Sequence, residues 1–312
     1  MTHTEVQAAQ AAEAARHREL TERISRHCPQ EGFHDTAVEP LTLIRCDAPT
    51  QRMHGVHEPA LCLIAQGGKD LYLGTERYRY DPLHFLLVSV ALPVCGQVIE
   101  ASPERPYLCL RLTLDPGEIA RLIADAGLSG AAQRPQGRGL YVQRLDESLL
   151  DAVLRLLRLL EAPADVPMLA PLVIREIFYR VLRGPQGHLL HDIAMGDSQA
   201  YRVTRAIEWL NDHYGQPLRI EDLARRVNLS VSTLHHRFKA LTALSPLQYQ
   251  KQLRLQEARR LMLSEGLEAS LAGHRVGYGS PSQFSREYSR LFGAPPLRDL
   301  AALRNGPATA PA

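Results

Sequence analysis

The sequence lacks the features that mark membrane, secreted and disulfide-stabilised proteins. No apolar run in its 312 residues approaches the roughly 20 residues that a membrane-spanning helix needs. The N-terminal stretch EVQAAQAAEAARHRELTERISRH alternates alanine with charges, without the unbroken apolar segment of a secretion signal. The five cysteines are odd in number and show no CxxC spacing, which argues against a disulfide framework. We therefore expect a cytoplasmic location.

The few cysteines leave room for one thiol-based alternative. All five lie before residue 110, and buried, inert thiols are the usual state of such residues. Cys95 lies in LPVCGQ, which reads as a turn, so we expect it to be the most exposed. It is the candidate sensor if the protein responds to electrophiles or oxidants. The full set is Cys28, Cys46, Cys62, Cys95 and Cys109.

Length and charge predict two domains of different character. A chain of 312 residues exceeds the roughly 100 to 200 residues usual for one domain. Residues 201–312 carry 16 Lys and Arg against 9 Asp and Glu, whereas residues 1–200 carry 20 against 25. A basic domain suits a polyanionic partner, because each phosphate contact releases counterions.

Short strands are predicted between about residues 38 and 114. The segments are apolar or alternating and are separated by turns: LTLIR, ALCLIAQ, DLYLG, RYRYD, HFLLVSV and YLCLRLTL. Gly67 and Gly68, between ALCLIAQ and KDLYLG, indicate a hairpin. Many short strands in succession predict a small barrel or sandwich.

The period becomes helical at about residues 115–183. DESLLDAVLRLLRLLEA and MLAPLVIREIFYRVLRG each place apolar residues on one stripe. The stripes contain Leu149, Val153, Leu156, Leu157 and Leu160, and Ile174, Ile177, Phe178 and Val181. Two interpretations stay open, since the stripes could cover the strands or form a dimer interface. We expect an N-terminal effector-binding or dimerisation domain over 1–190, followed by a linker at 191–200 that is rich in Gly and polar residues.

A helix-turn-helix is predicted at about 219–242. IEDLARRV supplies a short helix, Asn228 and Leu229 the turn, and Ser230 the N-cap of the helix VSTLHHRFKALT. One stripe of that helix is expected to be buried: Val231, Leu234, Phe238 and Leu241. The opposite stripe is polar: Ser232, His235, His236 and Lys239. A narrow polar face with donors and a positive charge suits the major groove of DNA.

The scheme repeats about fifty residues later, at about 268–292. AGHRVGY corresponds to LARRVNL, and Ser280 is the expected N-cap of the helix PSQFSREYSRLFG, with Gln283 as a capping-box partner. Its expected inward residues are Phe284, Tyr288 and Leu291, and its expected outward residues are Ser282, Gln283, Arg286 and Arg290.

A long helix between the units sets their separation. PLQYQKQLRLQEARRLML has about eighteen residues and would be roughly 27 Å long. Successive major grooves on one face of DNA lie about 34 Å apart. A rod of this size could hold two recognition helices in adjacent grooves.

These residues carry a family resemblance. The spans LSVSTLHHRFKALTALSPLQYQKQLRLQEARRLML and VGYGSPSQFSREYSRLFGAPP closely resemble the DNA-binding domain of the AraC/XylS transcription regulators. The match covers residues 201 to about 300. The region from VEPLTLIRCDAP to PYLCLRLTLDP also looks like the N-terminal domain of one AraC subgroup. The resemblance implies an α+β protein, with a cupin-like β-barrel, flanking helices and a DNA-binding domain at 201–302. We expect a disordered tail at 303–312.

The resemblance also assigns roles to positions that match. It implies base contacts from Ser232, His235 and His236 in the first unit and from Ser282, Gln283 and Arg286 in the second. It implies phosphate contacts from Arg237, Lys239 and Arg290.

Two positions depart from the family pattern. Gly273 stands where Ala is usual, and a helix-interior Gly costs up to about 1 kcal/mol, so we expect a looser second unit. His236 stands where Arg is common. A neutral His is a weaker ligand for guanine or phosphate, so the base preference of this helix is open.

A metalloenzyme is the rival from another class. His54, His57, Glu58 and His84 are possible ligands within the strands. His54 and His57, however, are three residues apart and point to opposite faces of a strand, and the HxH pair of metal-binding cupins is missing. We expect no metal site, no cofactor and no catalytic residues.

The functional prediction is a DNA-binding transcription factor, activating rather than repressing, that responds to a small molecule or chemical signal. Its expected partners are double-stranded promoter DNA, RNA polymerase, an unidentified effector and a second copy of the chain, with no membrane. The N-terminal domain would hold the effector and bias how the DNA-reading units are presented.

Overall fold

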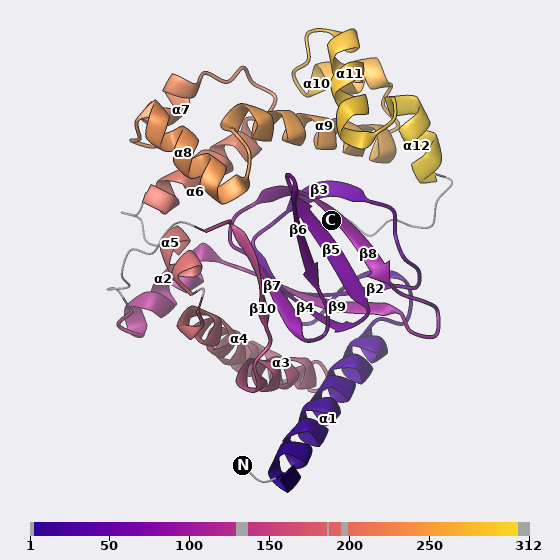
Figure 1. Cartoon of the computed structure of the whole chain (residues 1–312), viewed down its shortest axis with the longest axis vertical. Helices are drawn as coiled ribbons and strands as arrows, with labels where there is room; N and C mark the ends of the chain where they lie inside the picture. The colour runs from indigo at the N-terminus through magenta and orange to yellow at the C-terminus, as the bar shows by residue number, and fades with distance from the viewer. Residues whose placement is uncertain (1–2, 129–136, 186, 195–198, 305–312) are drawn as a thin grey trace.

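The computed structural model of the chain describes residues 3–128, 137–185, 187–194 and 199–304. Two β-sheets occupy the centre of the molecule, with the helices of the N-terminal half on one side and the C-terminal helices on the other (Figure 1). Helix α1 (His3–His27) leads into the sheets and packs on β2, β4 and β9. The α+β class expected from the sequence is confirmed.

The strands form two antiparallel sheets rather than one closed barrel. The six-stranded sheet has the order β1-β2-β9-β4-β7-β10 and the four-stranded sheet β3-β8-β5-β6, in the cupin-like manner expected. The strands are β1 (Gly32–Asp35), β2 (Leu41–Cys46), β3 (Met53–His57), β4 (Ala60–Gln66), β5 (Gly68–Leu73), β6 (Glu76–Tyr80), β7 (His84–Val88), β8 (Leu92–Glu100), β9 (Tyr107–Thr113) and β10 (Leu140–Arg144).

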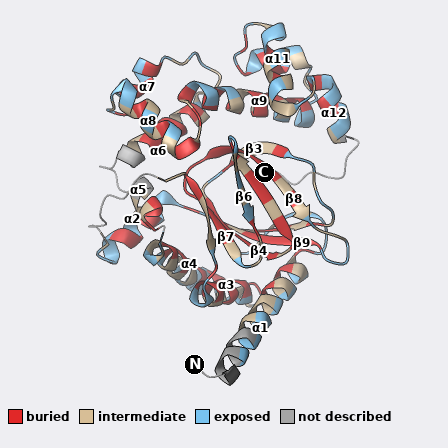
Figure 2. Ribbon diagram, viewed as in Figure 1, coloured by how far each residue is buried: buried red, intermediate tan, exposed pale blue. Residues whose placement is uncertain are grey.

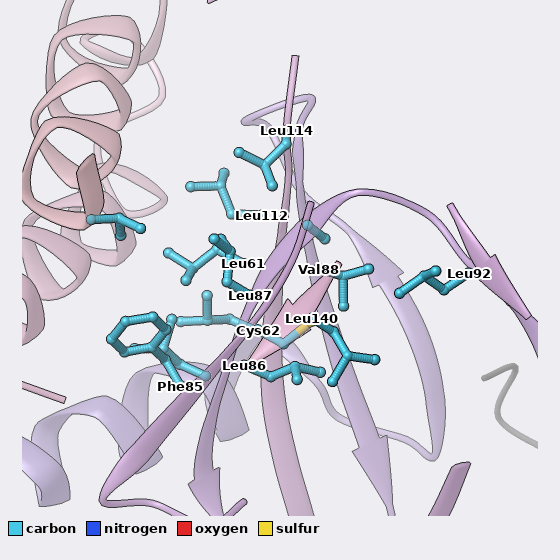
Figure 3. Close-up of a cluster of buried hydrophobic side chains, with 14 of the residues drawn as sticks. Leu61, Cys62, Phe85, Leu86, Leu87, Val88, Leu92, Leu112, Leu114 and Leu140 are labelled. Carbon is cyan, nitrogen blue, oxygen red and sulfur yellow. The ribbon is translucent and has the colours of Figure 1, made fainter. Parts of the chain in front are cut away.

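The centre of the six-stranded sheet is apolar on both faces. The first six residues of β4 are all buried, so neither face is open to solvent, and on one face Leu61 lies opposite Leu87 of β7 and Leu112 of β9. Figure 3 shows these leucines within the buried cluster, and Figure 2 shows how burial concentrates on the central strands. Continuous apolar strands of this kind fit a sheet that is covered on both sides.

The hairpin predicted at Gly67 and Gly68 is wrong. β4 pairs with β7 and β9, whereas β5 pairs with β6 and β8, so the two strands belong to different sheets. Gly67 has a φ of +85°, and a Cβ there would lie 2.4 Å from the carbonyl oxygen of Glu100. The glycine therefore serves a sharp crossing between sheets, where a side chain has no room.

Cys95 is not in an exposed turn, which corrects the second expectation for this region. LPVCGQ lies in β8, and Cys95 pairs with His54 of β3 and Tyr72 of β5. Pro93 and Gly96 made the segment read as a turn, yet both lie in the strand. Burial raises the pKa of the Cys95 thiol, which disfavours the reactive thiolate. The other four cysteines are buried as well.

Helices α2 (Pro116–Asp125), α3 (Glu147–Leu159) and α4 (Val166–Arg183) follow the strands. The Asp115 carboxylate accepts from the Gly117 N–H at 2.8 Å, and that of Asp146 accepts from the Leu149 N–H at 2.8 Å, so both caps stabilise a helix start. The predicted stripe of α3 is buried, and α3 packs on α1 and α4.

Helix α4 buries one face and exposes another. Ile177 and Phe178 lie in the core, as predicted. On the opposite side Met168, Leu172 and Tyr179 are 74%, 61% and 40% exposed. Their spacing places the three side chains on one stripe, which we call the α4 stripe.

The described part of the chain from residue 188 onward is helical. Its helices are α5 (His188–Ala194), α6 (Gln199–Asp212), α7 (Ile220–Arg226), α8 (Val231–Thr242), α9 (Pro246–Ser264), α10 (Ala269–Arg275), α11 (Pro281–Phe292) and α12 (Pro296–Arg304). Much of the region expected to be a linker is thus in α5 and the start of α6. The tail predicted from residue 303 still belongs to α12 at Leu303 and Arg304, and residues 305–312 lie outside the described residues.

The sheets hold the end of α8. Arg138 donates from Nε to Glu76 Oε2 at 2.9 Å and from Nη1 to the carbonyl oxygens of Lys239 and Ala240 at 2.9 and 2.7 Å. Because the C-terminal carbonyls of a helix are unpaired and partly negative, a guanidinium stabilises them well. The Gly139 N–H also donates to the Leu241 carbonyl at 2.8 Å.

A second contact joins the sheets to α9. The buried Tyr249 hydroxyl donates to the Ala91 carbonyl at 2.8 Å and lies 3.1 Å from Asn211 Oδ1 of α6. In the described parts of the chain, no helix is both long enough and apolar enough to cross a bilayer.

Candidate nucleic-acid interface

The first helix-turn-helix consists of α7 and α8, joined by a tight turn. Asn228 adopts a left-handed φ of 53°, a conformation that asparagine tolerates better than most residues. The Leu229 N–H donates to the Ala224 carbonyl at 3.0 Å, which closes the turn. The Ser230 side chain accepts from the Thr233 N–H at 3.1 Å, so the predicted N-cap is present.

One face of α8 is buried as expected, with one exception. Leu234, Phe238 and Leu241 pack in the core, whereas Val231 is 38% exposed. The expectation that Val231 points inward is wrong, because its side chain is not in the core. An apolar side chain thus stands beside the polar ones at the start of the helix.

The predicted outward face of α8 is accessible. Ser232, His236 and Lys239 are exposed, and His235 is half-buried. Arg237 is also half-buried and already interacts within the chain. The structure therefore brings the expected side chains of α8 to one face. They differ in how exposed they are and in whether they already interact within the chain.

The second unit, α10 and α11, repeats the first in detail. Gly277 takes the place of Asn228, with a φ of 93°, and the Tyr278 N–H donates to the Gly273 carbonyl at 2.9 Å. The Ser280 side chain accepts from the Gln283 N–H at 3.4 Å. The Gln283 side chain donates to Glu287 Oε1 at 3.3 Å instead of reaching back, so the predicted capping box is not formed.

Gly273 meets a packing requirement that the sequence does not reveal, and the expected looseness of the second unit stays a prediction. A Cβ on Gly273 would lie 2.8 Å from Phe284 Cγ. The corresponding pair of the first unit is Ala224 and Leu234, both buried. A smaller residue on the first helix thus faces a larger residue on the second.

The outward face of α11 is exposed along its length. Ser282, Gln283, Arg286 and Arg290 are all exposed. Arg286 makes no ion pair with any residue that the structure describes, so its guanidinium is available to a partner. Such a side chain can donate two hydrogen bonds to guanine.

A carboxylate beside this face is neutralised by its neighbours. Burial acts to raise the pKa of Glu287, but hydrogen bonds from Lys251, Tyr278 and Gln283 lower it overall. The Lys251 ammonium lies 3.0 Å from Glu287 Oε1, and the Tyr278 hydroxyl donates to Oε2 at 2.8 Å. The ion pair reduces the repulsion that a lone carboxylate would exert on a polyanion.

Helix α9 is anchored at both ends. Ser245 and Gln248 form a complete capping box at its start. Near its other end Arg259 forms two hydrogen bonds to Asp299 of α12, at 2.8 and 2.7 Å, and the Tyr288 hydroxyl of α11 donates to the same carboxylate at 2.7 Å. The sequence carries no signal for this network, because Arg259 lies 40 residues before Asp299.

The histidines considered as metal ligands lie apart. His54 packs edge-to-face on Phe292, with ring centroids 5.2 Å apart, while the buried His57 points to Cys62, with Nε2 3.7 Å from Sγ. His84 Nδ1 lies 2.7 Å from Asp81 Oδ1. His54 thus contacts a residue of α11, whereas His57 contacts a residue of β4.

A cupin-like domain followed by two helix-turn-helix units defines a class, the two-domain bacterial transcription regulators. Two family models match the chain. The "AraC-type transcriptional regulator N-terminus" matches residues 37–189, and the "Helix-turn-helix domain" matches residues 223–301.

Relatives of known sequence and structure agree. The transcriptional activators RhaS of Citrobacter koseri and of Salmonella typhimurium are 30% and 32% identical over 161 and 162 residues, which are 50% of this chain and 56% of theirs. The chain thus matches about half the length of these relatives. ToxT from Vibrio cholerae shares the fold, with a TM-score of 0.55 over 87% of this chain and 99% of its own at 12% identity. This chain belongs to the AraC family of transcriptional regulators.

Proposed function

We propose that this protein binds promoter DNA as a sequence-specific regulator and inserts α8 and α11 into successive major grooves. The duplicated unit carries the proposal, because both recognition helices have serine N-caps and exposed polar faces. Helix α9 spaces them by its 19 residues, roughly 28 Å of rise.

The side chains divide into two roles. Bases would be contacted by three side chains from each recognition helix: Ser232, His235 and His236 of α8, and Ser282, Gln283 and Arg286 of α11. Phosphates would be contacted by Lys239, Arg290 and Arg237. Arg237 would exchange its present interaction within the chain for the phosphate. Val231 adds an apolar contact at the start of α8, suited to the methyl group of thymine.

The regulatory direction is activation in response to a small molecule. The RhaS relatives are named as transcriptional activators, and an activator would also contact RNA polymerase. Structures of ToxT, which shares only the fold, are described as bound to an unsaturated fatty acid or to a naphthalenyl butenoic acid. By analogy, the N-terminal domain of this chain would provide the signal input.

The α4 stripe suits a second copy of the chain. Met168, Leu172 and Tyr179 lie on one side of an 18-residue helix, with Arg175 among them paired to Asp125. A two-fold pairing of this helix would cover three large apolar side chains on each copy and place the two DNA-binding regions on one duplex. Leu172→Glu should shift the mass of the particle in solution toward one chain, whereas Leu83→Glu, at an exposed leucine elsewhere, should not.

Genome-wide mapping of bound sites, followed by titration of the recovered fragments with purified protein, tests the DNA-binding proposal. We expect one motif with two half-elements about one helical turn apart, bound with a strong salt dependence. Binding without sequence preference, or none in dilute buffer, would contradict the proposal.

A further inference from the structure

A pocket lies between the sheets and the helix that connects the two DNA-reading units. Its volume is about 580 Å³, within the range of small-molecule sites. One wall is β3, with Met53, His54 and Val56, and the facing wall is α9. Residues from α6 and α12 close the sides (Figure 1 shows α9 above β3).

One polar side chain in this pocket has no partner. Gln256 of α9 is 8% exposed, and neither its amide nitrogen nor its amide oxygen has a hydrogen-bond partner among the residues that the structure describes. Gln250, one and a half turns earlier, is as deeply buried but donates to the Gln216 carbonyl at 2.8 Å. A buried amide without partners costs about 1 to 3 kcal/mol, so Gln256 calls for an explanation that Gln250 does not.

The other walls favour an uncharged molecule. The guanidinium groups at the pocket are already paired, Arg259 with Asp299 and Arg260 with Glu257. Much of the remaining lining is apolar: Met53, Val56, Leu253, Leu263 and Leu303. An anionic ligand would have to break an existing pair and would face the carboxylate of Glu58, whereas an apolar body gains from burial.

We propose that this pocket binds an uncharged small molecule with an apolar body and an amide-like pair of hydrogen-bond donor and acceptor, and that Gln256 is the residue that recognises it. The Gln256 oxygen accepts from the donor of the ligand, and its nitrogen donates to the acceptor. Specificity follows because a ligand without this pair leaves the buried amide unsatisfied.

The location gives the ligand a regulatory role, which rests on the proposed DNA binding. The ligand contacts β3 and α9 together and so fixes the N-terminal sheets against the rod that separates α8 from α11. A molecule that prefers this arrangement shifts the population toward it and changes DNA affinity through the spacing of the units.

The binding step is tested without DNA, by fluorine NMR of the full chain with 4-fluorobenzamide as the probe. We expect its signal to broaden with the wild-type protein and with Gln250→Leu, while Gln256→Leu binds roughly tenfold more weakly. 4-Fluorotoluene, which has the same apolar body without the amide, should bind no better to wild type than to Gln256→Leu. Equal binding of 4-fluorobenzamide to wild type and Gln256→Leu, or no binding to either, would overturn the proposal.

Stability provides the second measurement. Gln256→Leu should keep or raise the melting temperature of the ligand-free protein because it removes an unsatisfied amide, whereas Gln250→Leu should lower it because it leaves the Gln216 carbonyl without its donor. A loss of stability at Gln256→Leu as large as that at Gln250→Leu would show a structural role and overturn the assignment. Since neither measurement contains DNA, failure of the pocket and failure of DNA binding are distinguishable.

Discussion

The α-carbon of Gly273 lies so close to the ring of Phe284 that a Cβ on the glycine would be 2.8 Å from Phe284 Cγ and 3.0 Å from Cδ1. This contact joins the two helices of the second unit. In the first unit the corresponding residues are Ala224 and Leu234. The methyl group of Ala224 is larger than the hydrogen of a glycine, but Leu234 is smaller than a phenylalanine.

Gly273→Ala should therefore destabilise the second unit by about 1 to 3 kcal/mol, although alanine is the better helix former. Hydrogen exchange of the α10 and α11 amides measures the change. Adding Phe284→Leu, which recreates the pair of the first unit, should recover part of the loss. If Gly273→Ala alone slowed exchange, helix propensity would outweigh packing here.

Arg286→Ala should weaken binding to the cognate site by about 1 to 3 kcal/mol and relax base preference at one position. Lys239→Ala should lower affinity evenly across sequences and reduce the salt slope by about one. Titration of a set of single-base variants at several salt concentrations separates the two roles. If both variants lost affinity without any change in base preference, the assignment of Arg286 to bases and Lys239 to phosphates would be wrong.

His57 should make the protein less stable in acid. Burial, assisted by the nearby Lys69, lowers the pKa of His57 from 6.5 to about 4. Below pH 6.5 the unfolded chain therefore takes up a proton before the folded chain does, and stability falls as the pH drops toward 4, in total by about 3 kcal/mol.

Denaturant unfolding across this pH range measures the effect. His57→Gln should flatten the dependence in part, because burial likewise lowers the pKa of His54 to about 4. His34 of β1 is half-buried, and His34→Gln serves as the matched control. A wild-type slope in His57→Gln would contradict the assignment.

Arg138→Ala should release the end of α8 from the sheets. The guanidinium holds the pKa of the Glu76 carboxyl at about 2 and caps two carbonyls of α8. Both side chains are partly exposed, so solvent screens the pair and we expect a loss of about 1 to 2 kcal/mol.

Hydrogen exchange at the C-terminal turn of α8 provides the measurement. Arg121→Ala removes an exposed ion pair within α2 and should change stability by less than about 0.5 kcal/mol. Equal effects of the two substitutions would show that the contact to α8 contributes nothing.

The parts of the structure that follow from local pattern were predictable from the sequence. The serine caps, the turn at Asn228 and the repeat of one unit in the other all depend on residues within a few positions of each other. The same holds for the central strands β4, β7 and β9, whose apolar runs are bounded by turn residues.

The sequence-based expectations that were wrong concern residues whose environment is set by residues far away in the chain. Gly67 turns the chain between sheets because Glu100 approaches it, and Cys95 lies in a strand because β3 and β5 flank it. The glycine at position 273 is explained by the approach of Phe284. None of these relationships leaves a periodic trace in the sequence.

Two separate hydrophobic clusters meet within α9. Leu253 belongs to the large cluster that joins the sheets to the first unit, whereas Leu255, two residues later, belongs to the small cluster of the second unit with Phe284 and Tyr288. Mild heat or low denaturant should then melt the small cluster first, while the rest stays native. A partly denatured sample would keep the N-terminal sheets and the first unit folded, and would bind DNA through the first unit alone, with lower affinity and a shorter recognised sequence.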